Sequence, residues 1–244
     1  IQSGLHIFRQ ALNACLKNTN QYGYFIMKQK LKVWDLPTRL FHWLLAASVA
    51  FMWYSGEQGG DIMAWHLRCG VFIFGLLVFR ICWGIWGSDT ARFAQFFKPW
   101  QVGRYLKGSL SENEQPGHNP LGALMVVALI GAVLFQVVTG LLSSDENAFL
   151  YNGYLSGLAG SASADFRKLH VQFFDLLLIL IGVHVFTVLL YKFVKKHNLI
   201  TPMLTGYKYL EGKLPDLKFA GAGKLAAALV IAAAAVCAVV FAGA

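Results

Sequence analysis

The sequence predicts an all-α membrane protein in which four transmembrane helices form a bundle and a fifth transmembrane helix follows near the C-terminus. The first observation is composition: of 244 residues, 57% are hydrophobic and only 14% are charged, and the mean hydropathy is +0.52. A typical soluble domain has about 25% charged residues. The composition is therefore that of a membrane protein. The second observation is a set of long apolar segments, and the third is the placement of histidines within them.

Five apolar segments approach the length that a membrane span requires, which is about 20 residues for a hydrocarbon core ~30 Å thick. They are, approximately, Leu40–Tyr54, Ile62–Trp86, Leu121–Leu142, Leu169–Val194 and Leu225–Phe241. These segments divide the chain into an N-terminal extension (1–27), a transmembrane domain (28–206), a linker (207–223) and a C-terminal transmembrane helix (224–244). Residues 1–26 lack the basic and apolar regions of a signal peptide.

The distribution of charge predicts the orientation in the membrane. The formal net charge is +9, and lysines and arginines concentrate before the first apolar segment, after the second and after the fourth. The positive-inside rule then places the N-terminus and these basic segments in the cytoplasm, and the C-terminus on the outer side. Because the basic residues flank apolar segments, we expect them to contact membrane lipid and not nucleic acid.

Four histidines lie within or at the edges of the apolar segments, where ionisable groups are rare and usually functional. His170 and His184 are 14 residues apart in the fourth segment. On a helix this spacing places them roughly 21 Å apart along the axis and about 40° short of four full turns, so they share a face. That distance is too long for one metal ion, but it suits two sites at different depths.

The directions of the spans predict a partner for each of these two histidines. The first span enters from the cytoplasm, so His42 lies near the inner side with His184. The second enters from outside, so His66 lies near the outer side with His170. Imidazole is a common axial ligand of haem iron, and bundle helices often hold cofactors between them. The sequence therefore predicts two bis-histidine haem b groups. The absence of a C-x-x-C-H motif excludes covalent c-type attachment.

Three arginines and two glycines are candidates for contacts with these haems. Arg39, Arg80 and Arg167 are candidates to pair with haem propionates, since guanidinium binds carboxylate bidentately. For Arg39 and Arg167 the alternative is that the side chains extend to the membrane interface. Gly70 and Gly140 are candidates to make room for the porphyrin, although small residues also serve close helix packing in membranes.

One histidine outside the spans is a candidate for proton chemistry. His118 precedes the third span on the cytoplasmic side, and the near-neutral pKa of histidine would let it accept a proton from a quinol near the inner haem. The alternative is that it is an ordinary loop histidine without a special role.

Several of these segments resemble the bacterial cytochrome b561 family, which includes the b-type cytochrome subunits of nickel-iron hydrogenases. KVWDLPTRLFHWLL resembles the first helix of that family. WHLRCGVFIFGLLVFRICWGIWG resembles the second helix, FRKLHVQFFDLLLILIGVHVFTVLLY the fourth, and NLITPMLTG a segment near the end of many members. The resemblance covers about residues 28–206. It implies two b haems ligated by the four histidines, a four-helix core in the bacterial inner membrane and electron exchange with quinone.

Three functions remain open on the sequence. The first is transmembrane electron transfer between the quinone pool and a periplasmic redox partner, such as a cytochrome c or a hydrogenase-type subunit. The second is a stand-alone enzyme, such as a superoxide:quinone oxidoreductase, for which Arg167 and Lys168 beside His170 would attract an anion. The third is a membrane protein without haem, such as a metal transporter or an assembly anchor, that passes ions along the histidines.

Overall fold

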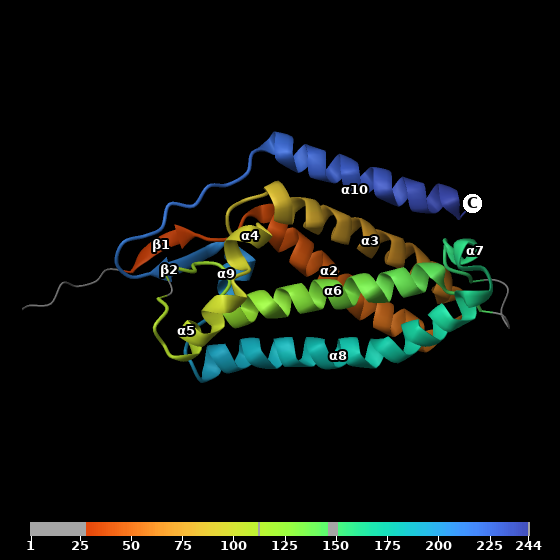
Figure 1. Cartoon of the computed structure of the whole chain (residues 1–244), viewed down its shortest axis with the longest axis horizontal. Coiled ribbons are helices and arrows are strands. Elements are labelled where there is room, and N and C mark those ends of the chain that lie inside the picture. Colours follow the sequence, from red (N-terminus) through yellow and green to blue (C-terminus); the bar gives the residue numbers. More distant parts are fainter. Residues whose placement is uncertain (1–27, 112, 146–150, 244) are drawn as a thin grey trace, which may run out of the picture.

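The computed structural model describes residues 28–111, 113–145 and 151–243, and the expected N-terminal extension (1–27) lies outside them. Five long helices run roughly along the length of the molecule (Figure 1). Their bounds are α2 (Leu36–Gln58), α3 (Met63–Trp86), α6 (Pro120–Leu142), α8 (Ser163–Phe193) and α10 (Ala222–Ala242). Each predicted apolar segment is thus a helix, and α2 and α8 begin earlier in the chain than expected.

Four of the five long helices in the described part of the chain are long and apolar enough to cross a membrane: α3 with its preceding turn, α6, α8 with its preceding turns, and α10. Length and composition therefore support four of the five predicted spans, and the first, α2, stays a prediction. Helix α2 has a similar length, but Arg39, His42 and Glu57 lower its hydropathy. It packs along α3 (Figure 1). This packing, and not its composition, is what places α2 beside the spanning helices.

Short elements gather at the two ends of the bundle. One end carries the strands β1 (Gln29–Lys32) and β2 (Tyr207–Leu210), the helices α4 (Phe93–Phe96), α5 (Val102–Leu106) and α9 (Ile200–Thr205), and the 3-10 turn η2 (Pro99–Gln101). The opposite end carries the 3-10 turn η1 (Gly60–Ile62), helix α7 (Ser156–Ala159) and the 3-10 turn η3 (Gly160–Ala162).

The two strands correct the all-α prediction, because β1 and β2 pair antiparallel, with Gln29 opposite Leu210. They join the segment before the first long helix to the segment after the fourth. The fold is therefore mostly helical, with one small sheet at the end of the bundle that also carries α9.

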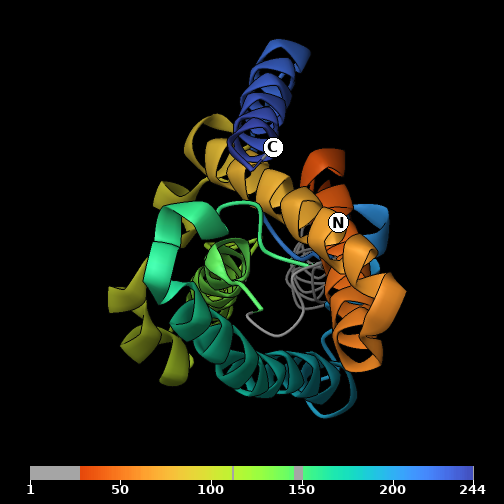
Figure 2. The ribbon, with the colours of Figure 1, turned by 90° about the vertical axis from the view of Figure 1, so that its right-hand side faces the viewer.

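The helices α2, α3, α6 and α8 surround a common axis, and α10 lies outside them against α3 (Figure 2). Close backbone packing joins α2 to α3, α3 to α6, α6 to α8, and α10 to α3. By contrast, the backbones of α2 and α8 approach each other at few points at most, and the same holds for α3 and α8. These two wide interfaces are where histidine side chains meet.

Helix α10 docks on α3 through small residues. Ala228 and Ala232 of α10 are buried, and a Cβ atom added to Gly75 of α3 would lie only 2.8 Å from a methyl group of Val236. Close approach through glycine and alanine is typical of helix pairs in membranes. Gly75 therefore serves helix packing against α10.

Candidate functional site

The four membrane histidines form two pairs of rings in the structure. His66 of α3 and His170 of α8 have ring centroids 6.2 Å apart, and His42 of α2 and His184 of α8 have centroids 6.4 Å apart. Two imidazoles that bind one metal ion from opposite sides, with metal–nitrogen distances of about 2.0–2.1 Å, also have their centroids a little over ~6 Å apart. We call these pairs the outer pair (His66 and His170) and the inner pair (His42 and His184).

Each ring of the outer pair has a hydrogen-bond partner for Nδ1. Nδ1 of His66 lies 2.9 Å from Oγ of Ser55 on α2, and that hydroxyl donates to the carbonyl of Met52 at 3.2 Å. Nδ1 of His170 lies 2.8 Å from the carbonyl oxygen of Gln136, whose side-chain amide donates back to the carbonyl of His170 at 2.8 Å. With Nδ1 engaged in this way, Nε2 of each ring is the nitrogen left for a metal.

Of the two candidate glycines, one contacts the outer pair directly. A Cβ atom added to Gly140 of α6 would lie 2.8 Å from Cε1 and 3.0 Å from Nδ1 of His170, so only glycine fits beside this ring. A Cβ atom added to Gly70 would meet Met52 at 3.8 Å, which is ordinary contact. Gly140 therefore sets the position of His170, whereas Gly70 contacts no histidine ring in this way, and its place beside a porphyrin stays a prediction.

The inner pair has different surroundings. Nδ1 of His42 is buried and has no hydrogen-bond partner among the described residues. The neighbouring residues on α2 are held by α9 instead: Trp43 donates to the carbonyl of Met203 at 3.2 Å, and Arg39 donates to the carbonyl of Leu204. Helix α9 thus fixes the start of α2, but no comparable bond orients the ring of His42 itself.

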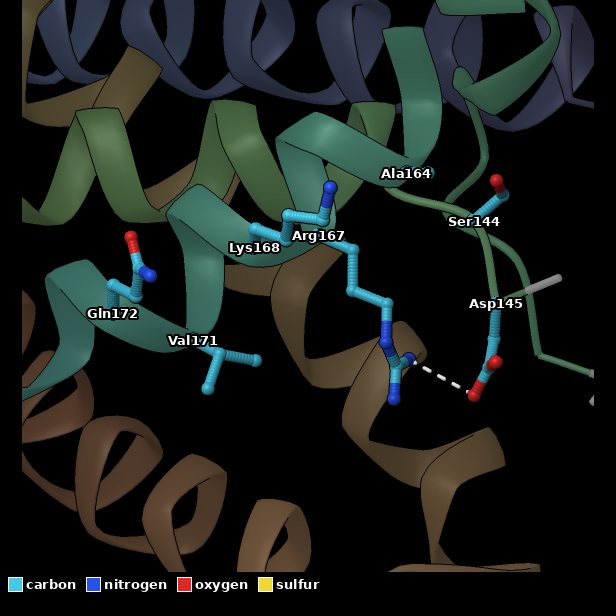
Figure 3. Close-up of a pocket in the computed structure, with 7 residues that line it drawn as sticks. All are labelled: Ser144, Asp145, Ala164, Arg167, Lys168, Val171 and Gln172. Carbon is cyan, nitrogen blue, oxygen red and sulfur yellow. Dashed lines mark ion pairs between the residues drawn. The ribbon is translucent and has the colours of Figure 1, made fainter. Parts of the chain in front are cut away.

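The three candidate arginines each bind a partner within the chain. Arg39 donates to Leu204, while its Nε is buried and has no partner among the described residues. Arg80 is buried, donates to the carbonyl of Ala91 at 3.1 Å and lies over the ring of Phe93. Arg167 forms an ion pair of 3.0 Å with Asp145 (Figure 3), beside a surface cavity of about 360 Å³.

His118 lies in a cage of aromatic side chains near the inner pair. Its ring is 4.7 Å from that of Trp34 and 4.8 Å from that of Phe96, measured between centroids. Its Nδ1 is buried and has no hydrogen-bond partner among the described residues. Burial, and secondarily the charge of Arg80, lowers the pKa of His118 to about 3. His118 is therefore neutral near pH 7.

A buried carboxylate that sequence reasoning missed joins α2 to α3 near the inner pair. Asp35 accepts a hydrogen bond from the backbone nitrogen of Thr38 at 2.8 Å and another from Nε1 of Trp83 at 3.0 Å. The signal for the first bond was present, because aspartate directly before a Leu-Pro pair is a typical helix N-cap. The bond to Trp83 had no signal in the sequence, and neither did that of Ser55 to His66.

The donor sets fit haem better than a bare metal ion. The described residues contain no group of three or more His, Cys, Asp or Glu side chains that could hold a metal ion together. Two imidazoles per site, facing each other across a wide helix interface, suit an iron that brings four equatorial ligands of its own. The close fit of Gly140 to His170 is consistent with a ring held at a fixed angle.

Comparison with known proteins gives a consistent result. A sequence model of the family described as prokaryotic cytochrome b561 matches residues 33–206. The chain is 26% identical over 221 residues to a probable Ni/Fe-hydrogenase B-type cytochrome subunit of Azotobacter vinelandii, covering 75% of this chain and 90% of that protein. It is 22% identical over 223 residues to the protein of the same description from Rhizobium leguminosarum bv. viciae, covering 77% and 92%. No solved structure gives a significant match.

Proposed function

Because this chain belongs to the prokaryotic cytochrome b561 family, whose members are b-type cytochromes of membrane electron transfer, we propose that it carries electrons across the bacterial inner membrane through two haems. The outer pair would hold one haem b and the inner pair the other. The observation that carries this proposal is the separation of 6.2 Å and 6.4 Å between the paired rings, at two depths of one bundle. When bound, each haem would supply one-electron chemistry.

The helices hold the two sites at a fixed separation. His170 and His184 lie on one continuous helix, α8, so their 14-residue spacing corresponds to roughly 21 Å along its axis. Leu177, halfway between the two histidines, is almost fully buried. The chain's own residues would thus bind the two haems and hold them at a fixed separation.

The orientation and membrane follow from charge and family. We place the N-terminus and the basic end with β1 and β2 in the cytoplasm, and the C-terminus in the periplasm. This orientation puts the inner pair near the cytoplasm and the outer pair near the periplasm. Quinone would react beside the inner pair, where His118 and its aromatic cage lie. Since His118 is neutral, it would hydrogen-bond to the quinone and not hold its proton at pH 7.

The periplasmic partner would react at the outer pair. The relatives named above are described as hydrogenase subunits, so a hydrogenase-type subunit is the first partner to test and a periplasmic cytochrome c the second. The alternative of a stand-alone superoxide:quinone oxidoreductase needs free positive charge beside His170. Two observations weigh against it, because Arg167 is paired with Asp145 and Lys168 with Asp165.

The deciding experiment is haem quantitation on the purified full chain, with a reduced-minus-oxidised spectrum. We expect two b haems per chain, and one or none would overturn the proposal. Reduction of the purified chain by a hydrogenase-type subunit, with a quinone as acceptor, would support the subunit function. Reduction by superoxide alone at a comparable rate would favour the stand-alone enzyme.

A further inference from the structure

We propose that Ser55 is a positioning residue for the outer haem and that it lowers the reduction potential of the outer site relative to the inner one. This inference rests on the proposed ligation by the two histidine pairs. Ser55 lies on α2, whose other end carries His42, and its side chain is completely buried against His66 of α3. One helix would therefore supply a ligand to the inner site and an oriented hydrogen-bond partner to the outer site.

The directions of the hydrogen bonds follow from the ligation. If Nε2 of His66 binds iron, the neutral ring carries its proton on Nδ1, so Nδ1 donates to Oγ of Ser55 over 2.9 Å. The hydroxyl of Ser55 in turn donates to the carbonyl of Met52. In this chain the His66 ring and the Ser55 hydroxyl each donate one hydrogen bond, and the Met52 carbonyl accepts the last one. The serine holds both the tautomer and the rotation of the ligand ring.

An acceptor on Nδ1–H makes an imidazole a more basic ligand. A more electron-donating ligand stabilises the ferric over the ferrous state, which lowers the reduction potential. His170 has an acceptor too, in the carbonyl of Gln136 at 2.8 Å. In the inner pair, Nδ1 of His42 has none among the described residues. With a haem at each pair, the transfer of one electron from the reduced outer site to the oxidised inner site would then be downhill.

The test is a redox titration of the full chain in membranes, followed by haem absorbance, for the wild type and for Ser55→Ala. The backbone carbonyl bonded to His170 cannot be removed by a side-chain substitution. Of the two acceptors in the outer pair, Ser55 is therefore the one that mutagenesis can test. We expect the wild type to give two waves, with the lower one from the outer site. In Ser55→Ala the lower wave moves to higher potential and the upper wave stays in place. His170→Ala, which lacks one outer ligand, identifies the outer wave by its loss.

Ser48→Ala is the matched control. Ser48 is also a buried serine of α2, but among the described residues its hydroxyl forms no hydrogen bond to a membrane histidine, so both waves should keep their wild-type positions. Ser55→Cys nearly preserves the volume while accepting hydrogen bonds only weakly, and it should shift the lower wave in the same direction as alanine.

Two outcomes separate the inference from the function on which it depends. If Ser55→Ala and Ser55→Cys retain two haems and neither wave moves, the role of Ser55 is wrong while the dihaem function stands. If the wild type binds fewer than two haems, the proposed function itself fails. Loss of the outer haem alone from Ser55→Ala, with about tenfold weaker retention, would support the positioning role.

Discussion

The outer and inner histidine pairs have nearly equal ring separations, 6.2 Å and 6.4 Å, but their surroundings differ. Around the outer pair, Ser55 and Gln136 bind Nδ1 of the two rings, and Gly140 packs against one of them. Around the inner pair, the bonds instead hold the backbone near His42, through α9 and Asp35. Hydrogen bonds thus hold the histidine rings themselves in the outer pair. In the inner pair they hold only the start of α2, which carries His42.

With haem at both pairs, as we propose, this difference predicts different tasks for the two sites. A ligand ring fixed by hydrogen bonds favours a defined potential and a stable geometry. The His42 ring has no such hydrogen bond among the described residues. Its basicity as a ligand would therefore depend on what binds beside it, near the aromatic cage of His118. We therefore expect substitutions near the rings to affect the outer haem, and substitutions at helix ends to affect the inner haem.

The largest expected effect comes from removing a ligand, and α8 offers a matched pair. His170→Ala should remove the outer haem and leave the inner one, whereas His184→Ala should do the reverse. Each variant should contain half of the wild-type haem, because it loses one imidazole of a single pair. Haem quantitation with a redox titration checks this, and loss of the same wave from both variants would contradict the pairing.

The next effect sharpens the outer site. Gly140→Ala would place a methyl group 2.8 Å from Cε1 of His170, which forces the ring to move. We expect about tenfold weaker retention of the outer haem, as for loss of an orienting contact, with the inner haem unchanged. Gly131→Ala, also on α6, is the control, since a Cβ atom added there would have no neighbour within 4 Å. Haem loss during dilution in detergent measures both, and equal loss from the two variants would refute the role of Gly140.

Much of this arrangement could be predicted from the sequence, because it depends on regular geometry. The spacing of His170 and His184 fixes their depth and face on any straight helix, and the apolar segments fix the long helices. The contacts that distinguish the two sites could not be predicted. Ser55 is one serine near the end of α2 and meets His66 only because α2 packs on α3. The pairing of β1 with β2 joins segments far apart in the sequence.

A smaller effect should be confined to the inner end. Asp35→Ala removes the cap of α2 and leaves Nε1 of Trp83 unpaired and buried. A lost cap costs about 1 kcal/mol and an unpaired buried donor about 1–3 kcal/mol, so we expect lower thermal stability and earlier release of the inner haem. Asp35→Asn keeps the capping oxygen and should lose less. Thermal denaturation followed by haem absorbance tests this, and earlier release of the outer haem would contradict the assignment.

The effect that is smallest near neutral pH, and that grows only in acid, concerns His118. Its pKa is lowered to about 3 in the folded protein by burial and then by Arg80, against about 6.5 in an unfolded chain. Between these values the unfolded chain binds one more proton, so the stability contributed by the neutral ring is complete above pH 6.5 and decreases as the pH falls toward 3. His42 and His184, which face the same region, also disfavour a charge on His118.

We therefore expect the free energy of unfolding of the wild type to fall more steeply below pH 6.5 than that of His118→Gln. The difference in slope should correspond to at most one bound proton, and the two profiles should be parallel from pH 7 to 9. Denaturant unfolding at a series of pH values measures the difference. Parallel profiles over the whole range would show that His118 is not a neutral buried base. They would also return proton transfer from quinol to consideration, because a ring with an ordinary pKa could hold that proton near pH 6.5.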